Sequence, residues 1–224
     1  MQLVSTIRYS VLDSGAARRF GLTIIPQAAQ LRAFGRDTSV ARAIVPGLKL
    51  GPVTASFPCL AADIPFSGVD AIIGLDVLRR QDFTIDYQAR KIVFGEPQPM
   101  EDRVAFEREA RLLIVPLRIA GRTLHMSMDT GVDGICLYEE NSQIWTFGQT
   151  GAAQLTVIHL GGETPGRQIG LARVLMGSCE WIGLKAAVLT PTQLLGRDGT
   201  LGVVSLGLAR IHFDFSHGLI SWQR

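Results

Sequence analysis

The stretch DAIIGLDVLRRQDFTIDYQARKIVF, residues 70–94, decides the fold because a second version of it, DGTLGVVSLGLARIHFDFSHGLISW, occupies residues 198–222. The two versions align without gaps, and each holds an aspartate, a glycine four residues later and a second aspartate sixteen residues after the first. Apolar residues also fall together, as at Phe94 and Trp222. An internal repeat of this kind predicts two homologous units. The identical positions are Asp70/Asp198, Gly74/Gly202, Leu78/Leu206, Asp86/Asp214 and Ile92/Ile220.

A second matched pair lies upstream of each copy, with VLDSGA at residues 11–16 and SMDTGV at residues 127–132. Each is an apolar segment that ends in Asp, then Ser or Thr, then Gly. The spacing from this aspartate to the later glycine is 61 residues in the first copy and 73 in the second, so the copies differ by about one hairpin. We therefore expect two lobes, residues 1–95 and 112–224, separated by an exposed, proline-containing connector at residues 96–111.

Inside both lobes the residue patterns predict short strands, so the expected fold class is all-β. One short helix per lobe is also expected, because leucine and valine recur there at helical spacing. Only Met1–Leu12 precede the aspartate of the first lobe, so its first strand is expected to be shortened or missing. The expected hairpins span residues 114–128 and 83–94, and the expected helices span Gly74–Arg80 and Gly202–Leu208.

Asp13 and Asp129 are the candidate chemical groups of the two lobes. A carboxylate followed by a small hydroxyl residue and glycine suits a tight loop, because the hydroxyl ties the loop by hydrogen bonds and glycine lets a ligand approach the backbone. One such triplet is a common turn, but its duplication allows two equivalent loops to meet at a pseudo-twofold axis. Two adjacent carboxyl groups share one proton, which yields an acid and a base able to activate water.

These residues resemble those of the aspartic proteases. The two triplet segments are each followed by an apolar-apolar-Gly segment, AIIG at residues 71–74 and GTLG at residues 199–202. The first copy is similar to the retropepsin-like aspartyl protease domains of bacteria, in which Gly-Leu-Asp-Val-Leu opens the helix after the strand that partners the catalytic loop. The resemblance covers nearly the whole chain and implies two acid-protease-like β-barrel lobes related by a pseudo-twofold axis.

The resemblance implies an aspartic endopeptidase that uses water as its nucleophile and binds an extended peptide or protein substrate beneath flaps. It implies neither a metal nor an organic cofactor. Asp13 and Asp129 would be the catalytic pair. The implied flaps span Gly35–Ile44 and His159–Arg173. The implied loop-bracing residues are Ser14, Thr130, Gly15 and Gly131, and the implied supporting residues behind the loops are Gly74 and Gly202.

A second hypothesis is a catalytically inactive, protease-like module that binds or scaffolds peptides, since a shortened first strand could misplace Asp13. Two lobes that form one cleft predict a monomer, whereas an incomplete N-terminal sheet would favour a dimer formed by strand exchange. A self-processing enzyme is a third hypothesis, which the sequence leaves open.

Composition excludes several other classes of protein. Hydrophobic residues make up 47% and charged residues 19% of the 224 positions, which is typical of a globular chain rather than a disordered one. The formal net charge is +2 and the basic residues are dispersed, so nucleic acid is not an expected partner. Cys59, Cys136 and Cys179 fit neither a disulfide framework nor a zinc site, and we expect all three in the core.

No stretch is long and apolar enough to predict a transmembrane helix, and no secretory signal is visible. We therefore expect a soluble chain, whose cellular compartment the sequence does not specify. Removal of a signal or anchor upstream of Met1 would make it an exported or periplasmic protein.

Overall fold

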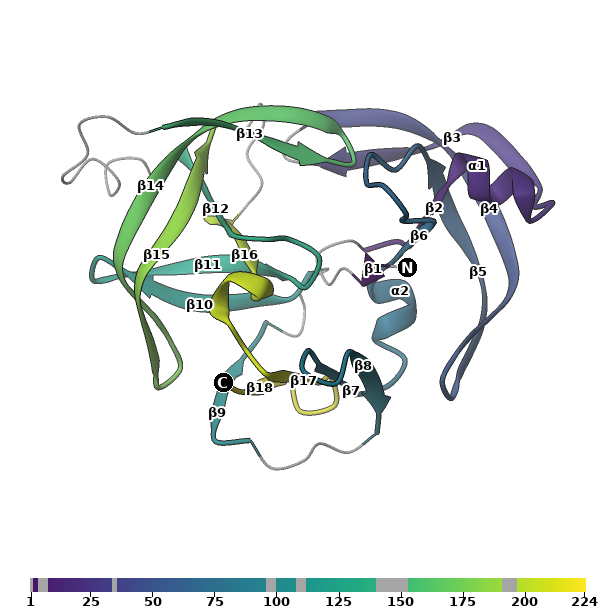
Figure 1. Cartoon of the computed structure of the whole chain (residues 1–224). Helices are drawn as coiled ribbons and strands as arrows, with labels where there is room; N and C mark the ends of the chain where they lie inside the picture. Colours follow the sequence, from purple (N-terminus) through teal and green to yellow (C-terminus); the bar gives the residue numbers. More distant parts are fainter. Residues whose placement is uncertain are drawn as a thin grey trace.

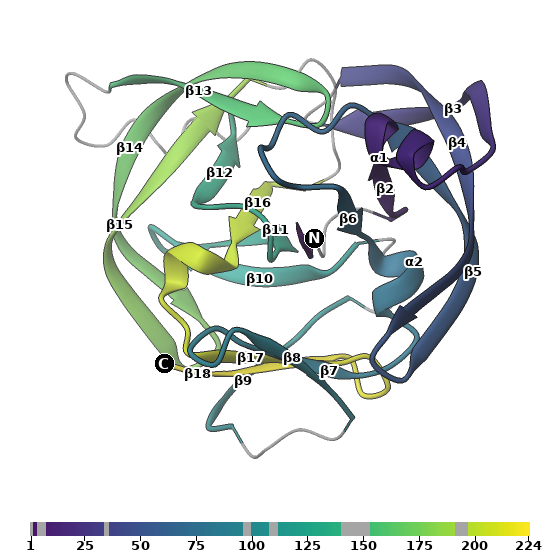
Figure 2. The same ribbon diagram turned by 45° about the vertical axis from the view of Figure 1, so that its right-hand side comes forward.

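The computed structural model describes residues 2–3, 8–33, 36–95, 100–107, 112–139, 153–190 and 197–224. The chain is mainly β, with three sheets and a few short helices (Figure 1). Two of the sheets lie on opposite sides of the molecule, and the third closes it from below in the views of Figures 1 and 2. This arrangement agrees with the expected predominance of strands.

The first sheet has six strands and is built from the N-terminal half of the chain. Its order is β1-β6-β2-β5-β4-β3. The first strand is only two residues long, as the short N-terminal segment predicted. The bounds are β1 Gln2–Leu3, β2 Val11–Asp13, β3 Ile24–Ala33, β4 Arg36–Leu50, β5 Val53–Ala62 and β6 Ala71–Ile73.

The second sheet has seven strands and is built from the C-terminal half, in the order β10-β11-β16-β12-β15-β14-β13. The predicted hairpin between β10 and β11 is present, and both turn residues, Ala120 and Gly121, have positive φ angles of 50° and 79°. Such a turn matches the twist of the strands it joins. The bounds are β10 Ile114–Ile119, β11 Arg122–Asp129, β12 Ile135–Tyr138, β13 Gln154–His159, β14 Gly162–Met176, β15 Cys179–Leu189 and β16 Gly199–Gly202.

The third sheet joins the two halves of the chain. Its order is β8-β7-β17-β18-β9, and its centre is the antiparallel pair of β7 and β17. Phe83 of β7 lies opposite Phe213 of β17, and their rings stack with centroids 4.9 Å apart. The bounds are β7 Phe83–Asp86, β8 Lys91–Phe94, β9 Asp102–Ala105, β17 Arg210–Asp214 and β18 Leu219–Gln223.

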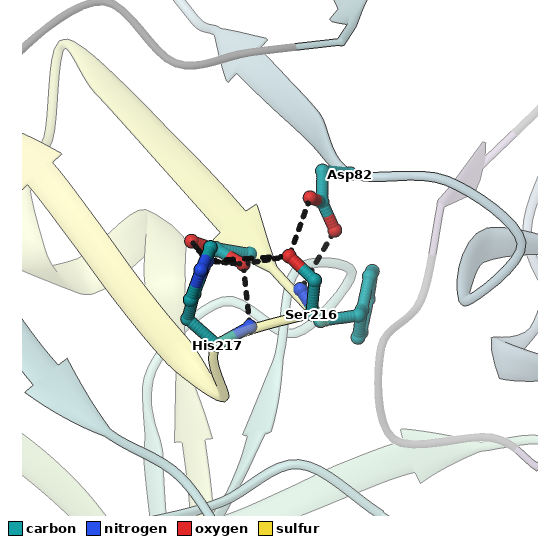
Figure 3. Close-up of polar contacts among 5 residues, drawn as sticks. Asp82, Ser216 and His217 are labelled. Carbon is teal, nitrogen blue, oxygen red and sulfur yellow. Dashed lines mark hydrogen bonds and ion pairs between the residues drawn. The ribbon is translucent and has the colours of Figure 1, made fainter.

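Side chains at one edge of this junction add polar contacts between the halves (Figure 3). Asp82, just before β7, accepts a hydrogen bond from the backbone N–H of Phe215 at 2.8 Å and one from the Ser216 hydroxyl at 3.3 Å. Asp214 accepts hydrogen bonds from Ser216 and from the backbone of His217, both at 2.8 Å, which closes the turn between β17 and β18. The turn of one half is therefore anchored to the other half.

The region expected to be an exposed connector, residues 96–111, differs from that expectation in its middle. Residues 102–105 form β9, which pairs with β18 and extends the joining sheet. Val104 and Phe106 are buried there because their apolar side chains pack into the main core. Residues 96–99 and 108–111 lie outside the described residues.

Short helical segments interrupt the strands, and the described part of the chain includes α1, α2 and η2. α2 at Leu75–Leu78 and the 3-10 helix η2 at Val203–Leu206 lie where one helix per half was predicted. α1 at Ser14–Arg19 was not predicted, because its sequence was interpreted as a loop triplet. No helix in the described part of the chain is long and apolar enough to cross a membrane.

Five neighbouring pairs of strands have the same order and the same sense in the first two sheets. The series β1-β6-β2-β5-β4-β3 matches β11-β16-β12-β15-β14-β13, with parallel, antiparallel, parallel, antiparallel and antiparallel pairs in both. In this correspondence β2 matches β12, and β1 matches β11.

A large hydrophobic cluster with members from both halves forms the main core. Trp222, Phe83 and Phe213 are among the largest fully buried side chains, so the joining sheet lies within this core. The three cysteines are buried and free, which confirms the prediction that they are core residues.

Candidate functional site

The Asp129 loop begins where β11 ends. β11 pairs in parallel with β16, and this register places Asp129 opposite Gly202, the last residue of β16. Asp129 is 5% exposed, and its Oδ1 accepts a hydrogen bond from the backbone N–H of Gly131 at 2.8 Å. Thr130 between them is also buried. The triplet Asp129-Thr130-Gly131 is therefore a tight turn that holds a carboxylate at the end of a core strand.

Gly202, which the family resemblance implied would lie behind this loop, contacts the loop backbone. Its N–H donates to the carbonyl of Gly134 at 2.8 Å. A Cβ atom at position 202 would lie 2.2 Å from the Gly134 carbonyl oxygen and 2.4 Å from that of Val132. Because real Cβ atoms do not approach backbone this closely, only glycine fits between β16 and the loop.

A buried chain of hydroxyl groups lies beside the Asp129 strand. Ser127 Oγ lies 3.1 Å from Thr200 Oγ1, which lies 3.2 Å from the Tyr138 hydroxyl. Ser127 also donates to the carbonyl of Gly199 at 3.1 Å, so this group ties β11, β12 and β16 together. These residues were not predicted from the sequence, since isolated serine and threonine residues in strands carry no spacing signal.

Asp13 occupies a different kind of position. It is the N-cap of α1, and its Oδ1 accepts a hydrogen bond from the backbone N–H of Ala16 at 2.9 Å. Its Oδ2 accepts a longer one from Ile64 at 3.4 Å. Ser14 and Gly15, expected to brace a catalytic loop, are instead the first two residues of the helix.

Hydrogen bonding keeps the Asp13 carboxylate charged. The bond from Ala16 lowers the pKa of Asp13, and although burial acts in the opposite direction, the bonds from Ile64 and Gly15 and the charge of Arg19 lower the pKa further. Every one of these groups belongs to the N-terminal half. A carboxylate used in this way is a helix cap.

The strand register shows where the two aspartates stand relative to the repeat. Leu12 of β2 lies opposite Ala71, the first residue of β6. Asp13, the next residue of β2, therefore lies at the end of the sheet where β6 begins. Asp129 lies opposite the final residue of β16. The structure therefore places Asp13 and Asp129 at non-equivalent ends of their sheets, which differs from the sequence alignment of their triplets. The residue that matches Asp13 is Tyr138, because Leu137 lies opposite Gly199 in β16.

The counterpart of the Asp129 loop in the N-terminal half follows β1. Leu3 lies opposite Ile73, just as Met128 lies opposite Leu201. The residue after Met128 is Asp129, whereas the residue after Leu3 is Val4. Residues 4–10, VSTIRYS, contain neither aspartate nor glutamate. Residues 4–7 lie outside the described residues.

Gly74 supports the part of this N-terminal segment that the structure describes. Its N–H donates to the Ser10 hydroxyl oxygen at 2.9 Å. The Ser10 hydroxyl in turn donates to Asp76 at 2.7 Å. Gly74 therefore contacts the segment before β2. The contact of Ser10 with Asp76 was not predicted from the sequence, although Asp76 lies in the quoted Gly-Leu-Asp-Val-Leu motif.

The expected flap in the C-terminal half, His159–Arg173, covers the end of β13, the turn after it and most of β14. Its tip is ordered by His159, whose Nε2 lies 2.9 Å from Thr164 Oγ1 and whose Nδ1 accepts from Gly161 at 3.0 Å. At the top of Figures 1 and 2 this hairpin reaches toward β3 and β4. Leu160 at the tip packs against an apolar cluster of the first sheet that includes Leu31. The hairpin thus bridges the two sheets.

The expected N-terminal flap spans Gly35–Ile44, and its residues from Arg36 onward lie in β4. Gly35 lies outside the described residues. β3 and β13 are the edge strands of their sheets, so both hairpins present backbone groups at a sheet edge.

The negative charge of Asp129 affects two buried groups. Burial, and secondarily this charge, raise the pKa of Cys136 to about 12. Burial and the same charge raise the pKa of Tyr87 to about 12 as well. Both groups therefore stay protonated at neutral pH. No cluster of three or more metal-ligating side chains occurs in the part of the chain that the structure describes.

Comparison with known proteins yields likenesses among solved structures. No family model matches the chain, and no curated protein matches it. One solved structure that it resembles is a retropepsin-like aspartic protease from Rickettsia conorii, with 22% sequence identity and a TM-score of 0.42. The likeness covers 55% of this chain and 98% of the solved one.

Proposed function

We propose that this chain is a two-lobed, aspartic-protease-like protein that binds an extended peptide at the Asp129-Thr130-Gly131 loop without forming a catalytic aspartate pair of its own. Its lobes are residues 1–95 and 112–224, related by a pseudo-twofold axis and acting as a monomer. The observation that carries the proposal is the strand register, which matches Asp129 with a position that is not acidic in the N-terminal half.

Hydrolysis by an aspartate pair needs two carboxyl groups that share a proton, one acting as base and the other as acid. Asp129 supplies one such group. Asp13 does not complete the pair in this proposal, because it caps α1 at the non-equivalent end of its sheet and its pKa is lowered there. A single buried carboxylate is instead suited to accepting hydrogen bonds from the backbone N–H groups of a bound peptide.

An extended peptide is the proposed ligand because of the two edge strands. An added strand can pair with an exposed sheet edge through its backbone, while alternate side chains enter pockets. β3 and β13 offer such edges on the two sheets, and Leu160 of the β13–β14 hairpin already lies on an apolar surface of the opposite sheet. A peptide that runs between the hairpins would meet both edges and the Asp129 loop.

Peptide-bond hydrolysis by a pair of Asp13 and Asp129 is the second candidate function. The geometry around Asp129 favours it, since a buried carboxylate in an Asp-Thr-Gly turn backed by Gly202 is the arrangement a catalytic loop requires. In this alternative the carboxylates of both aspartates would have to meet when a peptide binds.

Peptide binding by single-aspartate variants tests the proposal. A fluorescent library of extended peptides is titrated with the unmodified chain, with Asp129→Asn and with Asp13→Ser, which keeps a helix cap. We expect binding by the unmodified chain, weaker binding by Asp129→Asn and unchanged binding by Asp13→Ser. Equal loss of binding in both variants would contradict the proposal and favour a paired site.

A further inference from the structure

Arg8, in the segment that precedes β2, occupies the position that Asp133 occupies in the C-terminal half. The strand register matches β1 with β11 and β2 with β12, so residues 4–13 correspond to residues 129–138. The two segments have the same length, and the correspondence therefore contains no gap. Arg8 and Asp133 are each the fifth residue of their segment.

The two matched segments carry opposite charges. Residues 4–10, VSTIRYS, contain one arginine and no acidic residue, whereas residues 129–135, DTGVDGI, contain two aspartates and no basic residue. Arg8 and Asp133 are both exposed. The N-terminal half therefore offers a positive group to a ligand at the position where the C-terminal half offers a negative one.

The Arg8 side chain is held in place by an aromatic ring. Its guanidinium carbon lies 4.8 Å from the centroid of the Tyr9 ring, a distance at which the ring attracts a cation. The backbone is fixed as well, because the carbonyl of Arg8 accepts a hydrogen bond from the N–H of Asp76 at 3.1 Å. Within the described residues no carboxylate forms an ion pair with Arg8, whereas Arg19 of α1 is paired with Asp70 at 2.6 Å. The guanidinium N–H groups of Arg8 are therefore free to bind a ligand.

We propose that Arg8 is a specificity-determining residue that binds a carboxylate group of the extended peptide. A guanidinium group presents its N–H donors in a planar fork, which fits a carboxylate through two parallel hydrogen bonds. The Tyr9 ring and the anchored backbone reduce the freedom that the Arg8 side chain loses on binding. The inference rests on the proposed function for the presence of a peptide, and it adds that this peptide is acidic where it passes the N-terminal half.

The position of the N-terminal segment also assigns an orientation to the peptide. Figures 1 and 2 both draw β1 between β11 and β6, near the centre of the molecule. A peptide at the Asp129 loop would therefore also pass the segment that contains Arg8. Its acidic part would lie at the N-terminal half, because Asp129 and Asp133 repel a carboxylate at the other half. A peptide with one acidic end would bind in a single orientation.

Peptide binding by charge variants of Arg8 tests this inference. A fluorescent library of extended peptides is made in matched forms with Glu or Gln at one scanned position, each with a free or an amidated C-terminus. We expect the full chain to bind one Glu form about fivefold more tightly than its Gln form, Arg8→Gln to bind both equally and Arg8→Glu to prefer the Gln form. If Arg8 binds the C-terminal carboxylate, the same difference appears between the free and amidated forms.

Arg122→Gln is the matched control. It removes the same charge from the exposed first residue of β11, at the far end of that strand from Asp129, so it should keep the preference for a carboxylate. A preference that persists in Arg8→Gln, or that disappears equally in Arg122→Gln, would overturn the inference. A purely structural role of Arg8 would weaken the binding of all forms alike, which would overturn it too.

The same titrations separate this inference from the proposed function. Peptides that bind equally well with Glu or Gln and with a free or an amidated C-terminus would overturn the role of Arg8 and leave peptide binding in place. Absence of binding by every form to the unmodified chain would contradict the proposed function, and the role of Arg8 with it.

Discussion

Both carboxylate oxygens of Asp76 lie 3.0 Å from the backbone nitrogen of Ser10, and Oδ1 lies 2.7 Å from the Ser10 hydroxyl. This contact joins the segment before β2 to the start of α2, and Gly74 completes it by donating to the same hydroxyl. In the repeat, Val204 occupies the position of Asp76, and Gly202 bonds to a backbone carbonyl instead. The two halves therefore use different chemistry to hold equivalent segments.

Replacing Asp76 by alanine should destabilise the chain. The Ser10 N–H and hydroxyl would lose their acceptor, so we expect the free energy of unfolding to fall by about 1–3 kcal/mol in urea titrations. Val204→Ala is the matched control in the other half, where an exposed side chain is expected to cost less than about 0.5 kcal/mol. Equal losses in the two variants would mean that the Asp76 contact contributes nothing.

Asp13 should behave as a helix cap. Asp13→Ala is expected to lower the free energy of unfolding by about 0.5–2 kcal/mol, because the N–H of Ala16 loses its acceptor. Asp13→Ser should recover most of this loss, since serine also caps helices. A serine variant as unstable as the alanine variant would show that the charge of Asp13 has another role.

Gly202 should tolerate no side chain. Gly202→Ala would force a Cβ against the carbonyls of Gly134 and Val132, so we expect a loss of at least about 2 kcal/mol in stability and a displaced Asp129 loop. Gly47→Ala is the control, because no heavy atom lies within 4 Å of its added Cβ. Similar melting temperatures for the two variants would contradict the close approach described here.

The stability of the chain should depend on the protonation of His212. Burial lowers the pKa of His212 from its ordinary value of 6.5, while the charges of Asp82 and Asp214 oppose this shift. The unfolded chain therefore takes up this proton at higher pH than the folded chain. The stabilising contribution of the neutral ring is complete above about pH 6.5 and is lost as the pH falls through the folded pKa.

Urea titrations at several pH values measure this effect. The unmodified chain is expected to lose more stability on acidification than His212→Gln, which has no ring to protonate. Identical pH dependence of the two proteins would show that the His212 pKa is the same in the folded and unfolded states.

The repeat of residues 70–94 and 198–222 was sufficient to predict much of the fold. Both copies form the same sequence of strand, short helical turn and hairpin, because their glycines and apolar residues recur at the same spacing. The hairpins within 83–94 and 114–128 were predicted for the same reason, since alternation and turn residues are local signals.

The site was predicted less well because triplets are short. The triplets DSG, which begins at Asp13, and DTG, which begins at Asp129, differ by one methyl group. The first nevertheless starts a helix, whereas the second lies at the end of a core strand. A local pattern does not encode which strand pairs with which. Only the register of β1 with β6 could therefore reveal that Asp13 and Asp129 are not at equivalent positions. The contact of Asp76 with Ser10, 66 positions apart, was hidden for the same reason.

Peptide cleavage by the intact chain tests the central claim most directly. A diverse peptide library is incubated with the unmodified chain, Asp13→Asn and Asp129→Asn from acid to neutral pH, and the products are identified by mass spectrometry. We expect no cleavage by the unmodified chain at any pH, together with peptide binding that weakens in Asp129→Asn. Cleavage that disappears in both Asp13→Asn and Asp129→Asn, with both variants still folded, would contradict the claim and establish a two-aspartate peptidase.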